Sequence, residues 1–318
     1  MRGTAGRITL WGIEVFVACV EEASISAAAR RLGASPATVS QQVTNLEGAL
    51  GVTLLDRSAR PMVPTPAGRM FLARANVILS EAEQARAELA MADLSRLTRL
   101  RLGMIEDFDA DVTPRLLSGM AQELRNCRFL LETGASHRLI GMLDTRALDV
   151  IVATETEDTR PGLDRHPLLE EPFVAAVPKA LAGADLRRLR RLPLIRYTSR
   201  HWMGRAIAAH LQAQDLSLPQ RFEMDSYHAI LATVADGAGW TILTPLGWMR
   251  ARRFRDEVAV IPLPMAPLCR RITLTARTGA LGDMPGRIAA RLRPELEALV
   301  VRPAIEALPW LAGSMRVL

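Results

Sequence analysis

Residues 23–51, ASISAAARRLGASPATVSQQVTNLEGALG, read as two short helices joined by a very tight turn. Gly33 suits the left-handed position that commonly ends a helix. Ser35 can cap the next helix, and Pro36 falls at its first position, where a missing N–H costs nothing. The pattern predicts a first helix capped by Ser26 and stopped at Gly33, followed by a second helix. Two helices joined by a short glycine-containing turn are typical of a helix-turn-helix.

The second helix combines an apolar face with a polar but uncharged face. Its buried face is predicted from apolar residues at spacings of four, three and four: Val39, Val43, Leu46 and Leu50. Its opposite face carries hydroxyl and amide side chains: Thr38, Gln41, Gln42 and Asn45. Such amides suit the edges of DNA bases, because Gln and Asn can pair bidentately with adenine. An ordinary αα-hairpin with a solvated polar face is the alternative that this stretch alone leaves open.

Residues 50–68, LGVTLLDRSARPMVPTPAG, predict two short strands around a turn, with Arg57 and Arg60 near its tip. Such a wing is placed to send arginine along the DNA backbone or into the minor groove. Thr65 and the proline after it begin another helix.

Residues 66–96 show one uninterrupted helical pattern. Small and apolar residues recur along it at heptad spacing: Phe71, Ala75, Ile78, Ala82, Ala85, Leu89 and Ala92. Because alanine allows helices to approach closely, the seam predicts pairing with a second copy. A lone helix packing on its own domain is the alternative.

From residue 98 onward, short apolar runs alternate with amphipathic helices, which predicts an α/β architecture with mainly parallel sheets. The predicted strands are residues 100–105, 129–131, 150–153, 173–177, 194–195, 241–243, 258–261 and 272–274. Residues 303–318 show no clear period, and their role is unknown.

The N-terminal pattern resembles that of the LysR-type transcriptional regulators, densely over residues 16–68 and more loosely to about residue 300. The matching positions are Ala28, Ala29, Leu32, Ser35, Ser40, Leu46, Glu47, Leu50, Gly51, Arg57, Thr65, Ala67 and Gly68. Two positions depart from the family. The second helix starts Ser35-Pro36-Ala37-Thr38 where the family commonly has Ser-Gln-Pro-Ala, and Gln41 stands where arginine is frequent. Both departures should alter the preferred bases without removing DNA binding.

The resemblance and the helix faces together give a predicted set of DNA-binding residues. They are Ser26, Arg30, Ser35, Pro36, Ala37, Thr38, Ser40, Gln41, Gln42, Asn45, Arg57, Arg60 and Thr65.

The resemblance also implies the domain organisation. A winged helix-turn-helix (1–65) precedes a dimerising linker helix (66–96), and a two-lobed effector domain like those of periplasmic binding proteins follows (97–302). Lobe one is expected over 97–161 and 257–302, and lobe two over 162–256.

An effector is expected between the lobes, at strand ends and helix N-termini. The candidate residues are Glu106, Asp107, Phe108, Thr198, Ser199, Arg200, His201, Trp202, Asp225 and Ser226. Many relatives place Ser or Thr after the first strand to bind a carboxylate, whereas this chain has Asp107. Acidic groups beside aromatic rings favour a cationic or zwitterionic effector. A small carboxylate is the alternative, with the acids acting as ordinary helix caps.

Composition and motifs argue against other classes. The five histidines have no HExxH spacing, and neither a nucleophile elbow nor a Walker loop is present, so no catalytic residue and no cofactor is predicted. Cys19, Cys127 and Cys269 lie far apart, without metal-ligand spacing and outside lobe two, where a redox sensor of this family would need a pair. The N-terminus lacks a secretory signal and no run is long enough for a membrane span, so a cytoplasmic protein is expected.

The expected partners are double-stranded promoter DNA, a small-molecule effector, a homodimer or tetramer of this chain, and RNA polymerase. The net charge of +6 permits a polyanionic partner without demanding one. The alternative function is a two-lobed solute-binding protein, or an enzyme, whose helix-turn-helix does not bind DNA.

Overall fold

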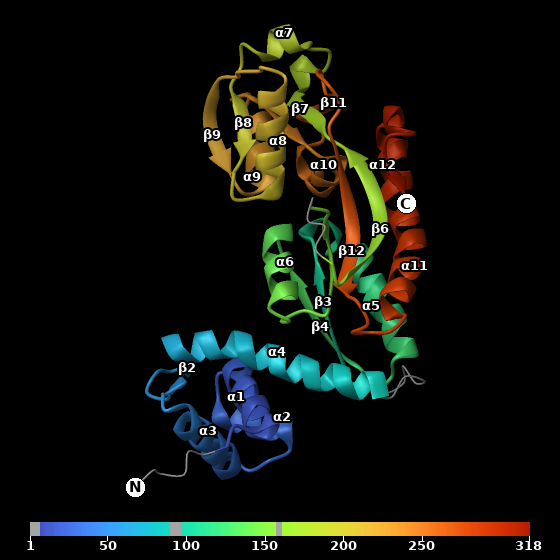
Figure 1. Cartoon of the computed structure of the whole chain (residues 1–318). Coiled ribbons are helices and arrows are strands. Elements are labelled where there is room, and N and C mark those ends of the chain that lie inside the picture. Colours follow the sequence, from blue (N-terminus) through green and yellow to red (C-terminus); the bar gives the residue numbers. More distant parts are fainter. Residues whose placement is uncertain (1–6, 90–96, 157–160) are drawn as a thin grey trace. The chain divides into compact units, whose positions relative to one another are not determined.

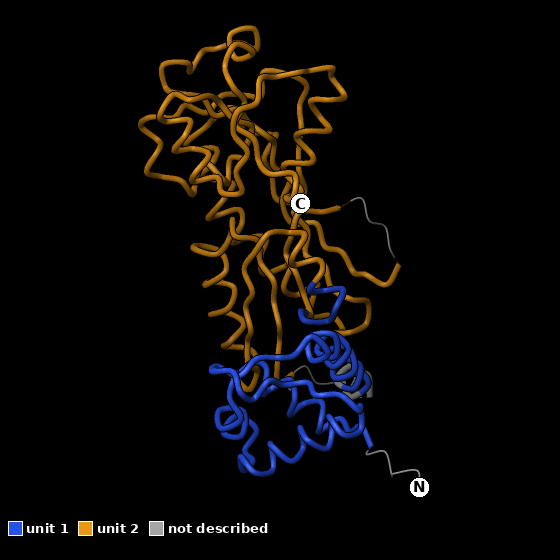
Figure 2. Tube along the Cα trace, turned by 90° about the vertical axis from the view of Figure 1, so that its left-hand side faces the viewer, with its two compact units in different colours: residues 1–92, 142–148 blue, residues 93–141, 149–318 orange. Residues whose placement is uncertain are grey.

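The computed structural model describes residues 7–89, 97–156 and 161–318. Two compact units are formed by residues 1–92 with 142–148, and by residues 93–141 with 149–318 (Figure 2). In the described residues, none of the helices has the length and apolar character required to cross a membrane.

The first unit is a winged helix-turn-helix followed by a long helix. Its elements are α1 (Leu10–Glu22), α2 (Ile25–Leu32), α3 (Pro36–Leu50), β1 (Leu55–Asp56), β2 (Val63–Pro64) and α4 (Pro66–Leu89). Gly33 adopts φ 63°, and Ser35 caps α3 by accepting from the backbone N–H of Thr38, as the sequence predicts. The rest of the predicted linker helix, residues 90–96 with Ala92 of the seam, lies outside the described residues.

The predicted cap of the first helix-turn-helix helix is wrong. Ser24 caps α2, its hydroxyl accepting from the N–H of Ala27, and Ser26 is an exposed residue of the first turn. The reason lies just upstream, where Ala23 takes a left-handed conformation (φ 49°) and ends α1. The chain therefore turns early enough for the first of the two serines to act as the cap.

The core of this unit lies between α1, α2, α3 and the start of α4. Phe16 is fully buried and its ring lies 5.4 Å from that of Phe71 on α4. Val39, Val43 and Leu46 are buried as predicted, which leaves the opposite face of α3 exposed. Packing thus fixes which face of α3 can meet a partner.

The second unit contains two sheets (Figure 1). The six-stranded sheet has the order β13 (Arg316–Val317), β6 (Leu163–Pro172), β12 (Cys269–Arg277), β5 (Val150–Thr154), β3 (Arg99–Met104) and β4 (Arg128–Thr133). The five-stranded sheet has the order β11 (Val258–Pro262), β7 (Val174–Pro178), β10 (Trp240–Leu243), β8 (Leu194–Tyr197) and β9 (Gln220–Met224). We call these sheets, with their helices, lobe one and lobe two.

Helices cover both sheets. In lobe one they are α5 (Val112–Glu123), α6 (Ser136–Asp144), α11 (Met284–Leu296) and α12 (Arg302–Ala307), with a 3₁₀ turn, η2 (Glu106–Phe108), after β3. In lobe two they are α7 (Leu186–Leu189), α8 (Trp202–Ala213), α9 (Tyr227–Ala235) and α10 (Pro245–Arg250). α11 packs on β6 and β12 and against α5, while α9 packs on β7, β8 and β10.

Every predicted strand is present, but the sheets are mixed rather than mainly parallel. β3 pairs in parallel with β4 and β5, and β8 with β9 and β10, whereas β6, β7, β11, β12 and β13 pair antiparallel. Of these antiparallel strands, β6, β7, β11 and β12 flank the two crossings between lobes, and β13 adds to the edge of lobe one beside β6.

The sheet topology also corrects the predicted lobe limits. β6 belongs to lobe one, so the chain crosses at residue 173 rather than 162. β11 belongs to lobe two, so the return crossing follows residue 262 rather than 256. The segment 303–318 is part of lobe one, because Arg316 and Val317 pair with Glu170 and Leu169 of β6.

Candidate nucleic-acid interface and ligand site

Helix α3 presents a continuous exposed stripe. It consists of Ala37, Thr38, Gln41, Thr44, Asn45 and Gly48. Hydrogen bonds hold its side chains: the Thr38 hydroxyl lies 2.8 Å from that of the capping Ser35, and the Gln41 amide nitrogen donates to Asn45 Oδ1 at 2.9 Å. Gln42 and Ser40 are only half-exposed and flank the stripe. Thr44 and Gly48 were missed by sequence reasoning, although the helical spacing from Ala37 and Gln41 includes them.

The side chain of Arg57, just after β1, packs against α3 instead of projecting from the tip of the wing. Its guanidinium donates to Glu47 Oε2 at 3.1 Å, Thr44 Oγ1 at 3.2 Å and Ser40 Oγ at 3.3 Å. Three acceptors on one helix orient the guanidinium along α3, so Arg57 joins the wing to the exposed stripe.

Glu47 completes this junction and was not predicted as a functional residue. Its Oε1 accepts from the backbone N–H groups of Leu54 and Leu55, at 2.8 and 3.2 Å. One carboxylate therefore links the end of α3, the first strand of the wing and Arg57. Glu47 is one of the positions that match the LysR-type pattern, and this match could have marked it as a functional residue.

The remaining predicted DNA-binding residues fall into two groups. Ser26, Arg30, Pro36 and Arg60 are exposed. Thr65 serves the fold, because its hydroxyl donates to the carbonyl of Thr53 and accepts from the N–H of Gly68, which caps α4.

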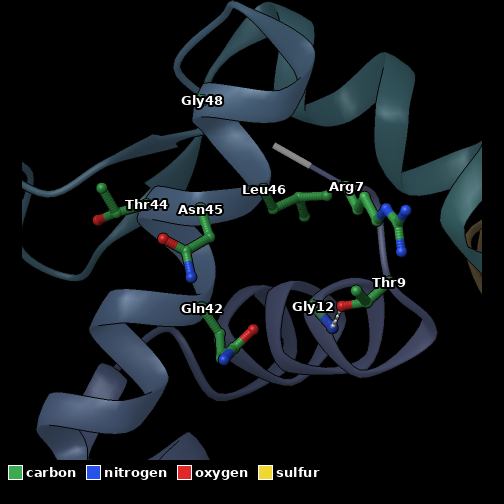
Figure 3. Close-up of a pocket in the computed structure, with 8 residues that line it drawn as sticks. All are labelled: Arg7, Thr9, Gly12, Gln42, Thr44, Asn45, Leu46 and Gly48. Carbon is green, nitrogen blue, oxygen red and sulfur yellow. Dashed lines mark hydrogen bonds between the residues drawn. The ribbon is translucent and has the colours of Figure 1, made fainter. Parts of the chain in front are cut away.

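A pocket of about 510 Å³ opens beside the stripe (Figure 3). It is lined by Arg7, Thr9, Gly12, Gln42, Thr44, Asn45, Leu46 and Gly48. The first three come from the start of α1 and the residues before it, and the other five from α3.

A buried ionic cluster of Asp107, Glu171 and Arg270 lies where the two lobes join. Arg270 donates through Nε to Glu171 Oε1 and through Nη2 to Asp107 Oδ2, both at 2.6 Å. The three side chains are 13%, 0% and 4% exposed, in that order. Lobe two adds the Thr244 hydroxyl, which accepts from Arg270 at 3.4 Å, and the N–H of Leu246, which donates to Glu171.

This cluster corrects the expectation that Asp107 contributes an unpaired negative charge. Its carboxylate is already neutralised by Arg270, 163 residues away in the sequence. The prediction that Phe108 contacts the ligand is also wrong, because its side chain is buried in lobe one and only 1% exposed. Neither can serve a cationic ligand in the manner expected.

The other candidate residues lie around the same junction. His201 on lobe two faces His137 on lobe one, with ring centroids 5.5 Å apart. The ring centroids of Trp202 and Phe173 are 6.4 Å apart. Burial and the nearby His137 lower the pKa of His201, while Asp225 and Glu106 oppose that shift. Glu106, Ser199, Arg200, Asp225 and Ser226 are exposed, and Thr198 is buried. His137 was not predicted, because nothing in the sequence ties it to residue 201.

Tyr197 is a further unpredicted residue of this junction. It is 3% exposed, and its hydroxyl has no hydrogen-bond partner among the described residues. Burial and the negative charge of Asp107 raise the pKa of its phenol well above the ordinary value. A buried hydroxyl without a partner can donate to a bound molecule.

The cysteines do not show the properties of reactive thiols. Burial raises the pKa of Cys19 and of Cys127 to about 11, and it also raises that of Cys269. Because the thiolate is the nucleophilic form, these thiols are poorly suited to react at neutral pH.

Two family models match the chain. Residues 10–69 match the bacterial regulatory helix-turn-helix proteins of the lysR family, and residues 95–285 match the LysR substrate binding domain. The two matches correspond to the winged helix-turn-helix and to most of the two-lobed unit.

Individual relatives carry names connected with hydrogen peroxide. A probable hydrogen peroxide-inducible genes activator of Mycobacterium xenopi is 34% identical over 185 residues, which cover 58% of this chain and 96% of that sequence. The match to its Mycobacterium avium counterpart, at 32% identity, spans 58% of the length of either protein. The DNA-binding transcriptional dual regulator OxyR of Escherichia coli is 26% identical over 281 residues, covering 84% of this chain and 89% of that one.

Solved structures share the fold. A full-length OxyR variant from Pseudomonas aeruginosa superposes with a TM-score of 0.68 at 22% identity, covering 90% of this chain and 94% of that one. Full-length CbnR complexed with its target DNA gives 0.57 at 20% identity, covering 90% of this chain and all of that one (100%).

Proposed function

Because the chain belongs to the LysR family of bacterial helix-turn-helix regulators, we propose that it reads promoter DNA with the exposed stripe of α3 and answers to a small zwitterion bound between its lobes. As a member of that family it is a DNA-binding transcriptional regulator with an effector-binding domain, and not an enzyme. The observation that carries the DNA-reading proposal is the stripe itself: six exposed, uncharged positions on a helix whose opposite face is buried.

In this proposal the stripe enters the major groove. Thr38 and Gln41 offer hydroxyl and amide groups to base edges, which suits adenine and thymine, and Asn45 lies beside Gln41 on the stripe. Ser26, Arg30, Ser35 and Arg60 serve the phosphates, which position the protein without specifying sequence. Arg57 and Glu47 act through their bonds to α3, by holding the helix against the wing.

Replacing Gln41 with alanine should lower affinity by about 1–3 kcal/mol for promoter DNA carrying the base that Gln41 contacts. The loss should shrink when that base pair is changed, because the contact is specific to one base edge. Affinity is measured by fluorescence anisotropy on the segment protected upstream of the protein's own gene, with each base pair varied in turn.

The control for this variant is Gln122→Ala, which removes an exposed glutamine from α5 in the second unit. Equal losses for Gln41→Ala and Gln122→Ala, or a Gln41→Ala loss that is the same at every base pair, would contradict base reading by α3.

Members of the family oligomerise, and we propose that this chain dimerises through α4, with further pairing of the effector domains to a tetramer. Ala75 is buried and Ile78 is 38% exposed on the described part of the helix, which leaves an apolar side chain available to a second copy. Two α3 helices related by a two-fold axis require an inverted-repeat site. From family membership alone, we also propose a cytoplasmic location and an action on RNA polymerase.

A zwitterion suits the charges that remain once Asp107 is paired. Glu106 on lobe one and Asp225 on lobe two are exposed acids close enough to His201 to influence its pKa, and Trp202 offers a ring to a cation. Arg200 and the hydroxyl of Tyr197 offer groups to a carboxylate. A small molecule with one ammonium and one carboxylate could contact both the acidic and aromatic side chains and the Arg200 and Tyr197 groups.

Amino acids or betaines should therefore raise the melting temperature of the full chain, with a stabilisation of about 2.7 kcal/mol at a hundred times the dissociation constant. A thermal-shift screen can compare each α-amino acid with the amine and the acid that lack one of its charges, and both singly charged analogues should do little. Stabilisation by plain dicarboxylates or aromatic acids, with none from zwitterions, would support the small-carboxylate alternative instead.

Peroxide is not proposed as the signal, despite the names of the relatives. Lobe two contains no cysteine, and the three thiols of the chain have raised pKa values. Oxidation of a thiol therefore has no suitable residue, which favours a reversibly bound ligand.

A further inference from the structure

We propose that the pocket beside α3 seats a phosphate of the DNA backbone, with Arg7 as its cation and the amide nitrogen of Asn45 as a second donor. The proposal rests on the proposed function, in which the stripe of α3 faces DNA. It adds to the interface Arg7 and Thr9, which precede the residues that match the helix-turn-helix model.

The lining of the pocket suits an anion. Its eight residues include one cation, two amides and two hydroxyls, and no carboxylate. Figure 3 shows Arg7 and Thr9 on one side of the space and Gln42 and Asn45 of α3 on the other. A phosphate placed between them would meet donors from both elements.

The amide of Asn45 is oriented by its neighbour. Gln41 donates to Asn45 Oδ1 at 2.9 Å, which fixes the oxygen toward Gln41 and leaves the amide nitrogen free to donate elsewhere. In Figure 3 that nitrogen lies on the side of the amide that faces Gln42. The base-reading stripe thus orients a donor for the pocket.

Arg7 is available to a ligand. Its side chain is exposed and makes no hydrogen bond or ion pair with any residue in the described ranges. Arg57, by contrast, is engaged by three acceptors on α3. Arg7 can therefore pair with a phosphate without breaking an existing contact.

Gly48 provides the open rim that a DNA strand needs. A Cβ built on it would meet nothing within 4 Å, so packing does not require glycine there. Glycine inside a helix is unfavourable by roughly 0.5–1 kcal/mol relative to alanine, and it is typical of sites where another backbone approaches closely. Gly48 lies both on the stripe and in the wall of the pocket. In this proposal the backbone that comes close to it is therefore the sugar-phosphate backbone of the DNA.

The test compares Arg7→Ala with the full-length protein on random-sequence duplex DNA and on the protected promoter segment, across a range of salt concentrations. One lost phosphate contact should reduce the slope of log affinity against log salt by about 0.9, and should weaken both DNAs alike. Arg7→Lys should keep most of the slope. Arg221→Ala, an exposed arginine of β9, is the control for the loss of one charge.

A second pair of variants tests the pocket without touching Arg7. Gly48→Glu should weaken binding to both DNAs far more than Gly48→Gln, and its effect should shrink in the Arg7→Ala background, because both act on one phosphate. A slope for Arg7→Ala that matches Arg221→Ala, or a loss confined to one base pair, would overturn the phosphate seat. Absence of any DNA binding by the unaltered protein would instead overturn the proposed function.

Discussion

Replacing Arg270 with methionine should lower the free energy of unfolding by about 3–5 kcal/mol. The substitution leaves Asp107 and Glu171 facing each other at 13% and 0% exposure, without the guanidinium that pairs with both. The penalty comes from uncompensated buried charge, because an ion pair of this kind adds little over a well-packed apolar replacement of all its members. Urea unfolding of the full chain measures it through tryptophan fluorescence, since Trp202, Trp240, Trp248 and Trp310 all belong to the second unit.

Arg271→Met is the matched control on the same strand. Its side chain is 47% exposed and forms ion pairs with Glu155 and Glu170 at the surface. Such pairs contribute about 0–1 kcal/mol. Equal losses for Arg270→Met and Arg271→Met would show that the cluster does not hold the lobes together.

Glu171→Gln should remove a large part of the dependence of stability on pH. Burial raises the pKa of Glu171 from 4.5 to about 7, although Arg270 lowers it. Because the folded pKa is the higher one, the protonated acid stabilises the fold fully below pH 4.5, and this contribution is lost as the pH rises through about 7. The shift in pKa corresponds to roughly 3 kcal/mol of pH-dependent stability. The Glu171→Gln variant lacks this contribution, because glutamine does not ionise.

The measurement is the free energy of unfolding of both proteins at several pH values between 4 and 8. The original protein should lose stability relative to Glu171→Gln as the pH rises. Glu170→Gln, at a half-buried neighbouring position, should leave the curve of the original protein unchanged in shape. Parallel curves for the original protein and Glu171→Gln would contradict a strongly raised pKa.

The sequence predicts best what short-range chemistry decides. Gly33, Ser35 and Pro36 define the turn and the start of α3 within four residues, and the apolar spacing then defines its buried face. The prediction of Ser26 as the cap failed, because the cap depends on where the previous helix ends, at Ala23. A pattern read from the second helix alone does not include that constraint.

What the sequence could not predict depends on contacts between distant segments. β6 contains two prolines and four charged residues, and it becomes a strand because it pairs along its length with β12. The charge of Asp107 depends on Arg270, and the pairing of His137 with His201 depends on how two lobes meet. The candidate effector residues therefore lie around one junction between the lobes, while the chemistry of individual members differs from the prediction.

The two crossings between lobes also determine the order in which the protein can fold as it leaves the ribosome. Lobe two is built from one continuous segment, β7 to β11, and its sheet is complete once residue 262 has emerged. Lobe one begins earlier but must wait for β12, the strand that joins β5 to β6 in the middle of its sheet. During that interval the edges of β5 and β6 are unpaired, and open strand edges are prone to association with other chains. Of the two lobes, the one that begins first is therefore finished last, and its nascent form is where we expect a chaperone to bind.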